Sequence, residues 1–271
     1  MGPVVAIGDP DDKRVDDYRN LTDAELRRRE EPGAGLFMVE GPTVIRHLLR
    51  SRYPVRSMLL SEAKWEQLRP EIDDLGDGGD WPVYVASNEM MRTITGFHFH
   101  RGALAAAGRQ PPADWRAIVE GRQRIAIAED VGDHENMGAL FRNAAAFGVT
   151  AVLLSPGSVD PLYRRAVRVS MGQVLRIPWA RAEPWPQVLT DLKAAGFRVV
   201  ALTPDPEAPA LRARGGPVAV LVGAEGPGLT AGARACADEL ARIPMRPSVD
   251  SLNVATAAAI AFYELTRSEG P

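Results

Sequence analysis

Short apolar runs alternate with helical patterns through the second half of the chain. The runs lie at residues 125–128, 151–154, 199–202 and 218–222, and the helical patterns lie near 138–147, 163–171 and 185–195. Strands that are apolar throughout and alternate with helices are typical of a parallel sheet covered on both faces. The sequence therefore predicts an α/β fold over residues 121–271, with a doubly wound parallel sheet.

The first part of the chain predicts a second, smaller domain. Strands are expected at residues 37–40, 55–60 and 83–85, and each is followed by a helical pattern, at 43–51, after Ser61 and at 88–94. This order predicts an α/β domain over residues 1–108. Residues 1–30 are charged and poor in apolar side chains, so a short amphipathic helix and a loop are expected there. Pro111 and Pro112 indicate a linker at residues 109–120.

The composition excludes several classes of protein. Hydrophobic residues make up 45% of the chain and charged residues 25%, which is ordinary for a soluble globular protein. No run approaches the roughly 20 apolar residues of a membrane helix, and the N-terminus lacks the pattern of a signal peptide. A cytoplasmic protein is therefore expected. The single Cys236 allows no internal disulfide and is interpreted as a small buried apolar residue.

Residues 243–256 contain the clearest sign of a binding site. The end of a short apolar strand leads through a loop into an alanine-rich helix that opens with Ser251 and Asn253. Unpaired backbone N–H groups and the positive end of the helix dipole gather at such a helix start. Small polar side chains beside them favour the binding of a ligand there.

Two further segments place loops after buried strands. Residues 221–229 join an apolar run to a glycine-rich turn that contains Glu225, and residues 125–149 join a strand to an acidic loop and a helix that carries Asn136 and Arg142. The acidic loop at residues 129–133 would repel a pyrophosphate, so a dinucleotide-binding fingerprint is excluded. A P-loop is excluded as well, because Gly228 is not followed by Lys and then Ser or Thr.

Taken in chain order, the segments 125–149, 221–229 and 243–256 resemble the three motifs of the SpoU (TrmH-like) class of the SPOUT superfamily. The members of this class are RNA 2′-O-ribose methyltransferases. The resemblance implies S-adenosylmethionine as cofactor, a deep trefoil knot in the C-terminal domain and a homodimer formed through that domain. Residues 37–42 and 98–105 resemble, more loosely, an N-terminal domain of such enzymes that is related to RNA-binding ribosomal proteins. This added domain favours ribosomal RNA over transfer RNA as the substrate.

The resemblance also implies where the cofactor binds. It places S-adenosylmethionine against Gly223, Ile243, Met245 and Leu252. Glycine would allow the backbone to approach the ligand closely, and the apolar side chains would enclose the adenine. Core packing is the alternative interpretation of the three apolar side chains. No metal is expected, because the pair His98 and His100 has no further His or Cys nearby.

Five residues are implied to act in methyl transfer. They are Arg142, Asn136, Glu225, Ser251 and Asn253. Arg142 would act either as a perturbed base or as a phosphate clamp, in its own subunit or across the dimer, and the high pKa of a guanidinium favours the clamp. Asn136 would brace its loop, and Ser251 and Asn253 would bind the ribose or the cofactor side. Glu225 would organise the glycine-rich turn or hold Arg142.

Any RNA-binding surface is expected to be local, since the formal net charge is −3. The best candidates in the C-terminal half are Arg164, Arg165 and Arg168, of which Arg164 and Arg168 share one face of a helix. A solvated helix surface is the alternative interpretation of these arginines.

Two positions depart from the family pattern. Ala224 stands where Asn is common, which removes a side-chain amide, and Pro247 stands where Gly is common, which stiffens the loop. Two other functions remain open from the sequence. One is a non-catalytic RNA-binding protein on the same scaffold, and the other is a small-molecule methyltransferase, which would better suit the missing excess of basic residues.

Overall fold

The computed structural model describes residues 2–21, 31–74, 80–96, 102–246 and 248–266. The chain divides into two compact units, one of Met1–Pro111 with Leu162–Arg176 and the other of Pro112–Pro161 with Ile177–Pro271. It therefore passes between the units three times. No helix in the described ranges combines the length and the apolar character that a membrane span requires.

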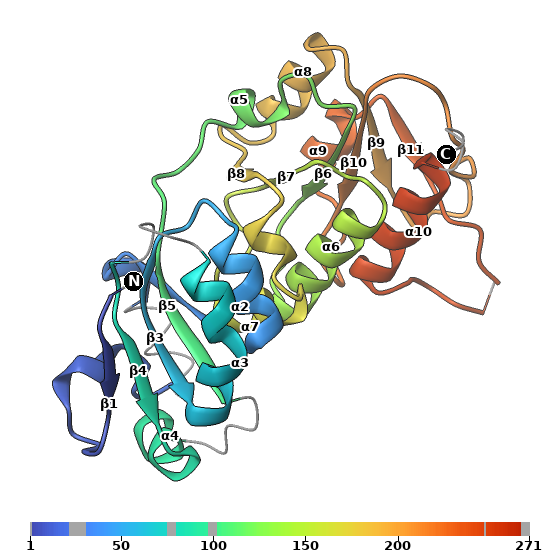
Figure 1. The fold of residues 1–271 in the computed structure, drawn as a ribbon. Coiled ribbons are helices and arrows are strands. Elements are labelled where there is room, and N and C mark those ends of the chain that lie inside the picture. Colours follow the sequence, from blue (N-terminus) through green and yellow to red (C-terminus); the bar gives the residue numbers. More distant parts are fainter. Residues whose placement is uncertain (1, 22–30, 75–79, 97–101, 247, 267–271) are drawn as a thin grey trace. The chain divides into compact units, whose positions relative to one another are not determined.

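The C-terminal unit is built on a parallel sheet (Figure 1). In the described part of the chain its six strands follow the order β11-β9-β10-β6-β7-β8, and all neighbours are parallel. The strands are β6 (Arg124–Ala128), β7 (Ala151–Leu154), β8 (Trp179–Arg181), β9 (Arg198–Leu202), β10 (Val218–Val222) and β11 (Glu239–Ala241). The predicted parallel α/β fold is confirmed, and the four predicted strands are present. The two short strands β8 and β11 were not predicted.

Helices cover both faces of this sheet. α5 (Trp115–Val119), α8 (Gln187–Ala194) and α9 (Ala231–Cys236) lie on one face, and α6 (His134–Ala146) and α10 (Val254–Thr266) lie on the other (Figure 1). On the first face, apolar side chains of the helices, such as Trp115 and Leu189, pack with alternate strand residues, such as Ile127 and Leu221. The strands are therefore buried on both sides, which explains their uniformly apolar sequences.

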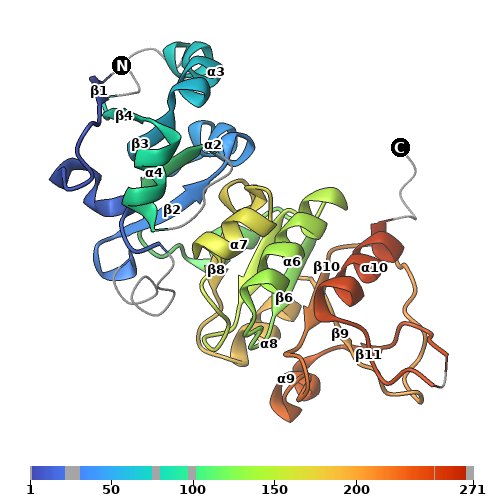
Figure 2. The ribbon, with the colours of Figure 1, turned by 90° about the horizontal axis from the view of Figure 1, so that it is seen from below.

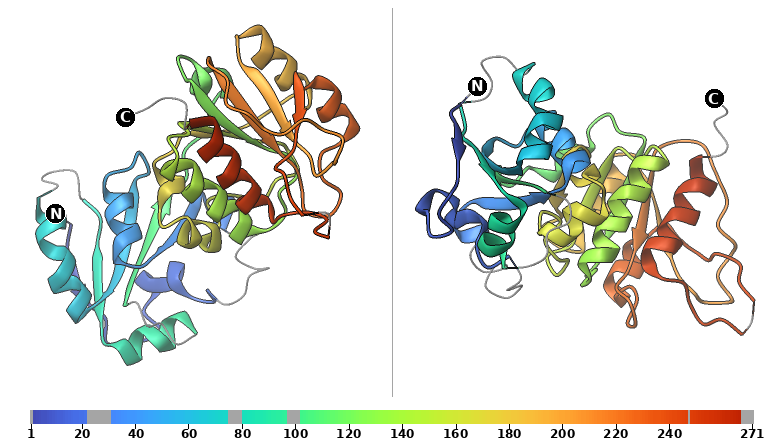
Figure 3. Two further views of the ribbon diagram at one scale, coloured as in Figure 1. Left: turned by 90° about the vertical axis from the view of Figure 1, so that its right-hand side faces the viewer. Right: turned by 60° about the horizontal axis from the view of Figure 1, so that its bottom comes forward.

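α6 and α10 lie side by side in both views of Figure 3. The side-chain amide of Asn143 donates to the carbonyl oxygen of Ala255 at 2.8 Å. The rings of Phe147 and Tyr263 meet edge to face, with 5.9 Å between their centroids. The first contact fixes the start of α10 against α6, and the second holds its later turns. This start is the helix N-terminus that the sequence indicated as a binding site.

The strand order reverses beside β6. From β6 the chain adds β7 and then β8 on one side, whereas β10, β9 and β11 lie on the other side. Open parallel sheets bind ligands outside the carboxyl ends of their strands, at such a reversal. The loops that follow β6, β9 and β10 therefore meet at the edge where a site is expected.

The N-terminal unit contains a mixed sheet in the order β1-β4-β3-β5-β2. Its elements, seen also in Figure 2, are β1 (Val4–Ala6), η1 (Lys13–Tyr18), β2 (Leu36–Glu40), α2 (Pro42–Leu49), β3 (Val55–Ser61), α3 (Glu62–Asp73), β4 (Val83–Ala86), α4 (Asn88–Thr95), β5 (Ala103–Gly108), α7 (Arg164–Val169) and η3 (Gln173–Leu175). The three predicted strands and their helices are present. Ser61 caps α3 as expected, because its hydroxyl accepts from the N–H of Lys64 at 3.3 Å.

Two strands of this sheet were missed. β5 is antiparallel to both β2 and β3, and β1 is parallel to β4. The expectation of only a helix and a loop over residues 1–30 was therefore wrong at residues 4–6. Residues 22–30 lie outside the described residues, as do His98 and His100.

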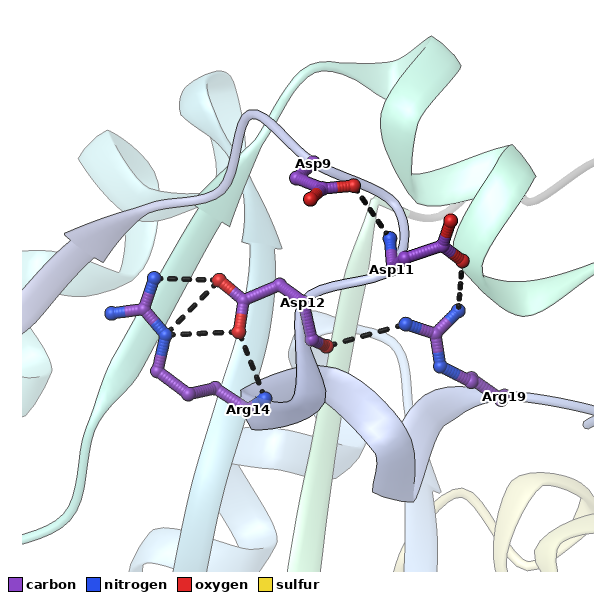
Figure 4. Close-up of polar contacts among 5 residues, drawn as sticks. All are labelled: Asp9, Asp11, Asp12, Arg14 and Arg19. Carbon is purple, nitrogen blue, oxygen red and sulfur yellow. Dashed lines mark hydrogen bonds and ion pairs between the residues drawn. The ribbon is translucent and has the colours of Figure 1, made fainter.

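A cluster of five charged side chains stands where η1 begins (Figure 4). Asp12 accepts from the N–H of Arg14 at 2.9 Å and from its guanidinium at 2.6 Å, and these hydrogen bonds lower the pKa of Asp12 to about 2. Arg19 donates to the carbonyl oxygen of Asp12 at 3.2 Å and lies 3.9 Å from the carboxylate of Asp11. The carboxylate of Asp9 accepts from the backbone N–H of Asp11 at 2.9 Å. Because Asp12 and Asp11 occupy the two cations of the cluster, this surface is poorly suited to RNA phosphates.

The segment Leu162–Arg176 packs within the N-terminal unit. Arg164 at the start of α7 donates to the carboxylate of Glu40 at 3.1 Å and to the carbonyl oxygen of Leu21 at 2.8 Å. Arg168 lies 3.8 Å from the same carboxylate, whose side chain is only 6% exposed. The face that was expected to be an exposed arginine pair is therefore turned toward Glu40, whereas Arg165 is exposed.

We expect Arg164→Ala to lower the free energy of unfolding by about 2 kcal/mol, because it removes a charged hydrogen-bond donor from a buried carboxylate. Arg165→Ala is the matched control on the same helix and should change stability by less than about 0.5 kcal/mol. Chemical denaturation of both variants measures the difference. Equal stability of the two variants would contradict the structural role of Arg164.

Candidate active site

A cavity of about 580 Å³ opens at the carboxyl edge of the parallel sheet. Its lining residues come from the loops after β9 and β10, from α9 and from the segment that leads into α10. They are Leu202–Asp205, Val222–Leu229, Arg234, Ile243, Met245, Ser251–Val254 and Ala257. All four predicted cofactor residues line it, and so do three of the five predicted catalytic residues, Glu225, Ser251 and Asn253. The structure thus brings together residues that are up to 55 positions apart, from Leu202 to Ala257.

The glycine-rich turn after β10 forms one wall of the cavity. Within the turn, the N–H of Gly228 donates to the carbonyl oxygen of Ala224 at 3.1 Å. Gly226 and Gly228 have φ angles of +86° and +69°. Such angles favour glycine over any residue with a Cβ atom. Glycine is therefore needed to close the turn tightly enough to leave room beside it.

Gly223 is required by the packing of this turn. A Cβ atom at Gly223 would lie 2.6 Å from the carbonyl carbon of Gly228 and 2.6 Å from the nitrogen of Leu229. The close approach that requires glycine here is therefore between two parts of the turn itself. The expected close approach of Gly223 to the ligand stays a prediction.

Asn253 joins three parts of the site. Its side-chain oxygen accepts from the N–H groups of Ala255 at 3.0 Å and Thr256 at 3.2 Å, which caps the start of α10. Its side-chain nitrogen donates to the side-chain oxygen of Asn136 and to the carboxylate of Glu225, both at 2.8 Å. The cap fixes the orientation of the amide, so its two N–H groups have to face Asn136 and Glu225.

Asn136 reaches this network from the first turn of α6. Asp133 caps that helix, because its carboxylate accepts from the N–H groups of Glu135 and Asn136 at 2.8 Å each. The same helix carries Arg142, which is exposed and does not line the cavity. Within the described ranges, the side chain of Arg142 forms no hydrogen bond or ion pair. It is thus available to a ligand outside this chain.

The segment after β11 forms the opposite wall of the cavity. Arg242 anchors it, because its backbone N–H donates to the carbonyl oxygen of Pro209 at 2.9 Å and its side chain donates to that of Ala208 at 2.9 Å. Ile243, Met245 and Leu252 are half-buried and line the cavity rather than the core. Pro247, one of the two departures from the family pattern, lies outside the described residues.

Several of the lining residues were not among the predicted site residues. Thr203, Pro204 and Asp205 follow β9, and Arg234 lies on α9. The side chain of Arg234 is exposed and has no hydrogen-bond or ion-pair partner among the described residues. The loop after β9 could have been found, because that strand was predicted and loops at the carboxyl ends of parallel strands line ligand sites.

The acidic side chains of the loop after β6 form hydrogen bonds within the protein. Glu129 accepts from Thr230 and Trp185, and Asp130 pairs with Ser155 at 2.7 Å. Asp133 caps α6. These carboxylates therefore hold neighbouring segments of the chain in place. They also agree with the prediction that this loop does not bind a pyrophosphate.

Comparison with known proteins identifies the class of enzyme. The model of the SpoU rRNA Methylase family matches residues 123–263. A Mycobacterium tuberculosis protein named as an uncharacterized tRNA/rRNA methyltransferase, Rv0881, is 48% identical over 268 residues, which are 97% of this chain and 91% of that protein. The structure of an AdoMet-bound rRNA methyltransferase from Sinorhizobium meliloti matches with a TM-score of 0.81 and 27% identity, covering 99% of both chains.

The chain belongs to the SpoU rRNA methylase family. It is an RNA methyltransferase, and S-adenosylmethionine is its cofactor. The resemblance of the three sequence motifs is confirmed at this level.

The chemistry of the cavity fits this cofactor. Leu202, Ile243 and Leu252 offer apolar surface for an adenine ring, and Asp205 offers a carboxylate that can accept from ribose hydroxyls. Arg234 offers an unpaired cation to the carboxylate of the amino-acid end. The lining thus contains groups suited to the adenine, the ribose and the carboxylate of S-adenosylmethionine.

We expect Asn253→Asp to lower methyl transfer by about 100-fold or more, because it removes both donors to Asn136 and Glu225 and places two carboxylates together. The helix cap remains, since an aspartate oxygen accepts the same N–H groups. Asn253→Ala should in addition lose about 1 kcal/mol of stability with the cap. Kinetics and thermal unfolding separate the two effects, and full activity of the Asp variant would show that the network is not needed.

We expect Gly223→Ala to weaken S-adenosylmethionine binding by more than about tenfold and also to destabilise the protein by about 1–3 kcal/mol, because the Cβ atom displaces the backbone of the turn. Gly232→Ala on α9 is the control, since a Cβ there would meet its nearest atom at an ordinary 3.6 Å. Calorimetry and thermal unfolding measure both effects. Weakened binding at unchanged stability would instead indicate direct contact between Gly223 and the ligand.

Proposed function

We propose that the protein transfers the methyl group of S-adenosylmethionine to a ribose 2′-hydroxyl of ribosomal RNA. The observation that carries this proposal is the polar network of Asn136, Asn253 and Glu225 at the edge of the cofactor cavity. A purely structural scaffold does not require three polar side chains to converge beside a cavity. This convergence favours an enzyme over the alternative of a non-catalytic RNA-binding protein.

Two similar proteins support the ribose 2′-hydroxyl as the methyl acceptor and ribosomal RNA as the substrate. The 23S rRNA (guanosine-2′-O-)-methyltransferase RlmB of Ralstonia nicotianae is 30% identical over 187 residues, which cover 67% of this chain and 75% of that protein. A solved RNA 2′-O ribose methyltransferase is 27% identical with a TM-score of 0.73, covering 98% of both chains. Since both are RNA enzymes, they favour this substrate over a small molecule.

The chain's own residues would align the reacting hydroxyl. When bound, S-adenosylmethionine would supply an electrophilic methyl group. The ribose oxygen would form a bond to this methyl carbon as the carbon–sulfur bond breaks, which releases S-adenosylhomocysteine and a proton. Ser251, exposed beside Asn253, would hold the ribose, and the Asn136–Asn253–Glu225 network would keep the walls of the cavity in place. Arg142 would clamp the RNA phosphate next to the reacting nucleotide, because a planar guanidinium matches phosphate oxygens. Alignment alone can supply much of the rate acceleration.

The proposal includes a trefoil knot in residues 121–271 and a homodimer formed through this unit. In support of the dimer, Ile260 and Tyr263 of α10 are 39% and 51% exposed, and Val249 is 47% exposed. Apolar side chains exposed on one helix favour an interface. Because Arg142 does not line the cavity of its own chain, it would act at the site of the partner subunit. Light scattering of the purified protein tests the dimer.

The decisive experiment uses tritium-labelled S-adenosylmethionine and bacterial ribosomal RNA, followed by alkaline hydrolysis. A methylated 2′-oxygen cannot attack the neighbouring phosphate, so the label should be recovered in an alkali-resistant dinucleotide. Label in mononucleotides would indicate methylation of a base. Cofactor binding without label in any RNA would support the non-catalytic protein or the small-molecule enzyme.

We expect Arg142→Ala to lower methyl transfer by about 10²–10³-fold while it leaves cofactor affinity unchanged, because the proposed contact is with the RNA. Arg142→Lys should restore little activity, since a point charge cannot replace a bidentate fork. Single-turnover rates and calorimetry measure the two properties. A fully active Lys variant would rule out the bidentate clamp.

A further inference from the structure

The most completely enclosed carboxylate beside the site belongs to Glu129. It directly follows β6, and its residue is 0% exposed, so it cannot touch the RNA or the cofactor. Carboxylates are rarely buried to this extent unless they are fully hydrogen-bonded. We propose that Glu129 is a positioning residue that fixes both ends of the glycine-rich turn 223–229 and thereby shapes the cofactor cavity.

The side chain of Glu129 holds the end of the turn. One carboxylate oxygen accepts from the N–H of Thr230 at 2.8 Å. The other accepts from the hydroxyl of Thr230 at 2.7 Å and from the indole N–H of Trp185 at 2.8 Å. Both oxygens are thus occupied, and Thr230 immediately follows the last residue of the turn.

The backbone of Glu129 holds the beginning of the turn. Its N–H donates to the carbonyl oxygen of Val222 at 2.8 Å, and Val222 is the residue before Gly223. The residue that directly follows β6 therefore fixes the chain on both sides of the turn. Within it, the N–H of Gly228 donates to the carbonyl oxygen of Ala224.

The same contacts also place α9. The hydroxyl of Thr230 accepts from the N–H of Ala233 at 3.1 Å, so Thr230 caps this helix. Arg234, the cation in the lining of the cavity, is in the first turn of α9, where its N–H donates to the carbonyl oxygen of Thr230 at 3.0 Å. Glu129 therefore acts through Thr230 on both the turn and Arg234.

A carboxylate is required here because every partner is a donor. Glutamine has one oxygen and one NH₂ group, so Glu129→Gln would place its NH₂ group against either the N–H of Thr230 or the indole N–H of Trp185. Either arrangement leaves a donor that faces the buried side chain of residue 129 unsatisfied. The size and shape of the side chain remain unchanged, which makes Gln a specific test of the contacts.

Fixed ends matter for a turn of this composition. Three of its seven residues are glycines, which lose the most conformational freedom when they are ordered. A turn that is already ordered before the ligand binds does not lose that freedom on binding, and this strengthens affinity. Because this role presupposes that the cavity holds S-adenosylmethionine, it rests on the proposed function.

The test compares Glu129→Gln with Ser155→Ala by calorimetry with S-adenosylhomocysteine and by thermal unfolding. Ser155 is equally buried and forms two hydrogen bonds with Asp130, the residue after Glu129, but on the side away from the turn. Ser155→Ala should therefore destabilise the protein without changing its affinity more than twofold. Glu129→Gln should weaken the affinity at least tenfold. Its KM for S-adenosylmethionine should rise, with KM for RNA unchanged.

Thr230→Val provides a second variant in case Glu129→Gln does not fold. It removes the hydroxyl that donates to Glu129 and keeps the backbone N–H, so it should weaken affinity by at least threefold. If folded Glu129→Gln or Thr230→Val bound S-adenosylhomocysteine as tightly as the wild type, the proposed role of Glu129 would be overturned. An equal loss of affinity in Ser155→Ala would overturn it as well. If the wild-type protein itself did not bind S-adenosylhomocysteine, the assignment of the cavity would be wrong instead.

Discussion

The amide of Asn253 is the contact on which the site depends most. It carries four hydrogen bonds, two accepted from the first turn of α10 and two donated to Asn136 and Glu225. A side-chain amide is needed, because only its oxygen and its NH₂ group together can accept on one side and donate twice on the other. Asn253 thus joins α6, the glycine-rich turn and the helix N-terminus.

The turn between β10 and α9 is held from two sides. Asn253 contacts Glu225 within the turn, while Glu129, which directly follows β6, holds the two ends of the turn. The contacts of Glu129 follow from the strand order, because β6 and β10 are neighbours at the point where the order reverses. The topology therefore places the cavity, and the polar side chains give it a defined shape.

Most strands of the two sheets could be predicted from the sequence, but the short strands and the alanine-rich strand could not. β8 and β11 have three residues each, too few for an apolar run to be distinctive. β5 reads Ala-Leu-Ala-Ala-Ala-Gly, which is a poor strand sequence, yet it lies between β2 and β3 and is buried. In such a position, packing with the neighbours outweighs local propensity.

The site shows the same limit. The motif residues Gly223, Ile243, Met245 and Leu252 could be placed at one cavity because they belong to recognisable segments. The place of Arg234 at the cavity and the pairing of Arg164 with Glu40 could not be predicted, because the residues that meet there are far apart in sequence. The pair Arg164 and Arg168 has the spacing of an exposed helical face, and only the fold shows that Glu40 lies against it.

Hydrogen exchange measured with and without S-adenosylhomocysteine tests the central claim most directly, namely that the loops at this edge of the parallel sheet together form the cofactor site. The account predicts slower exchange at residues 203–205, 222–229 and 243–257, and unchanged exchange in the sheet of the N-terminal unit. Protection confined to other segments, or saturating ligand without protection of the turn 223–229, would contradict it.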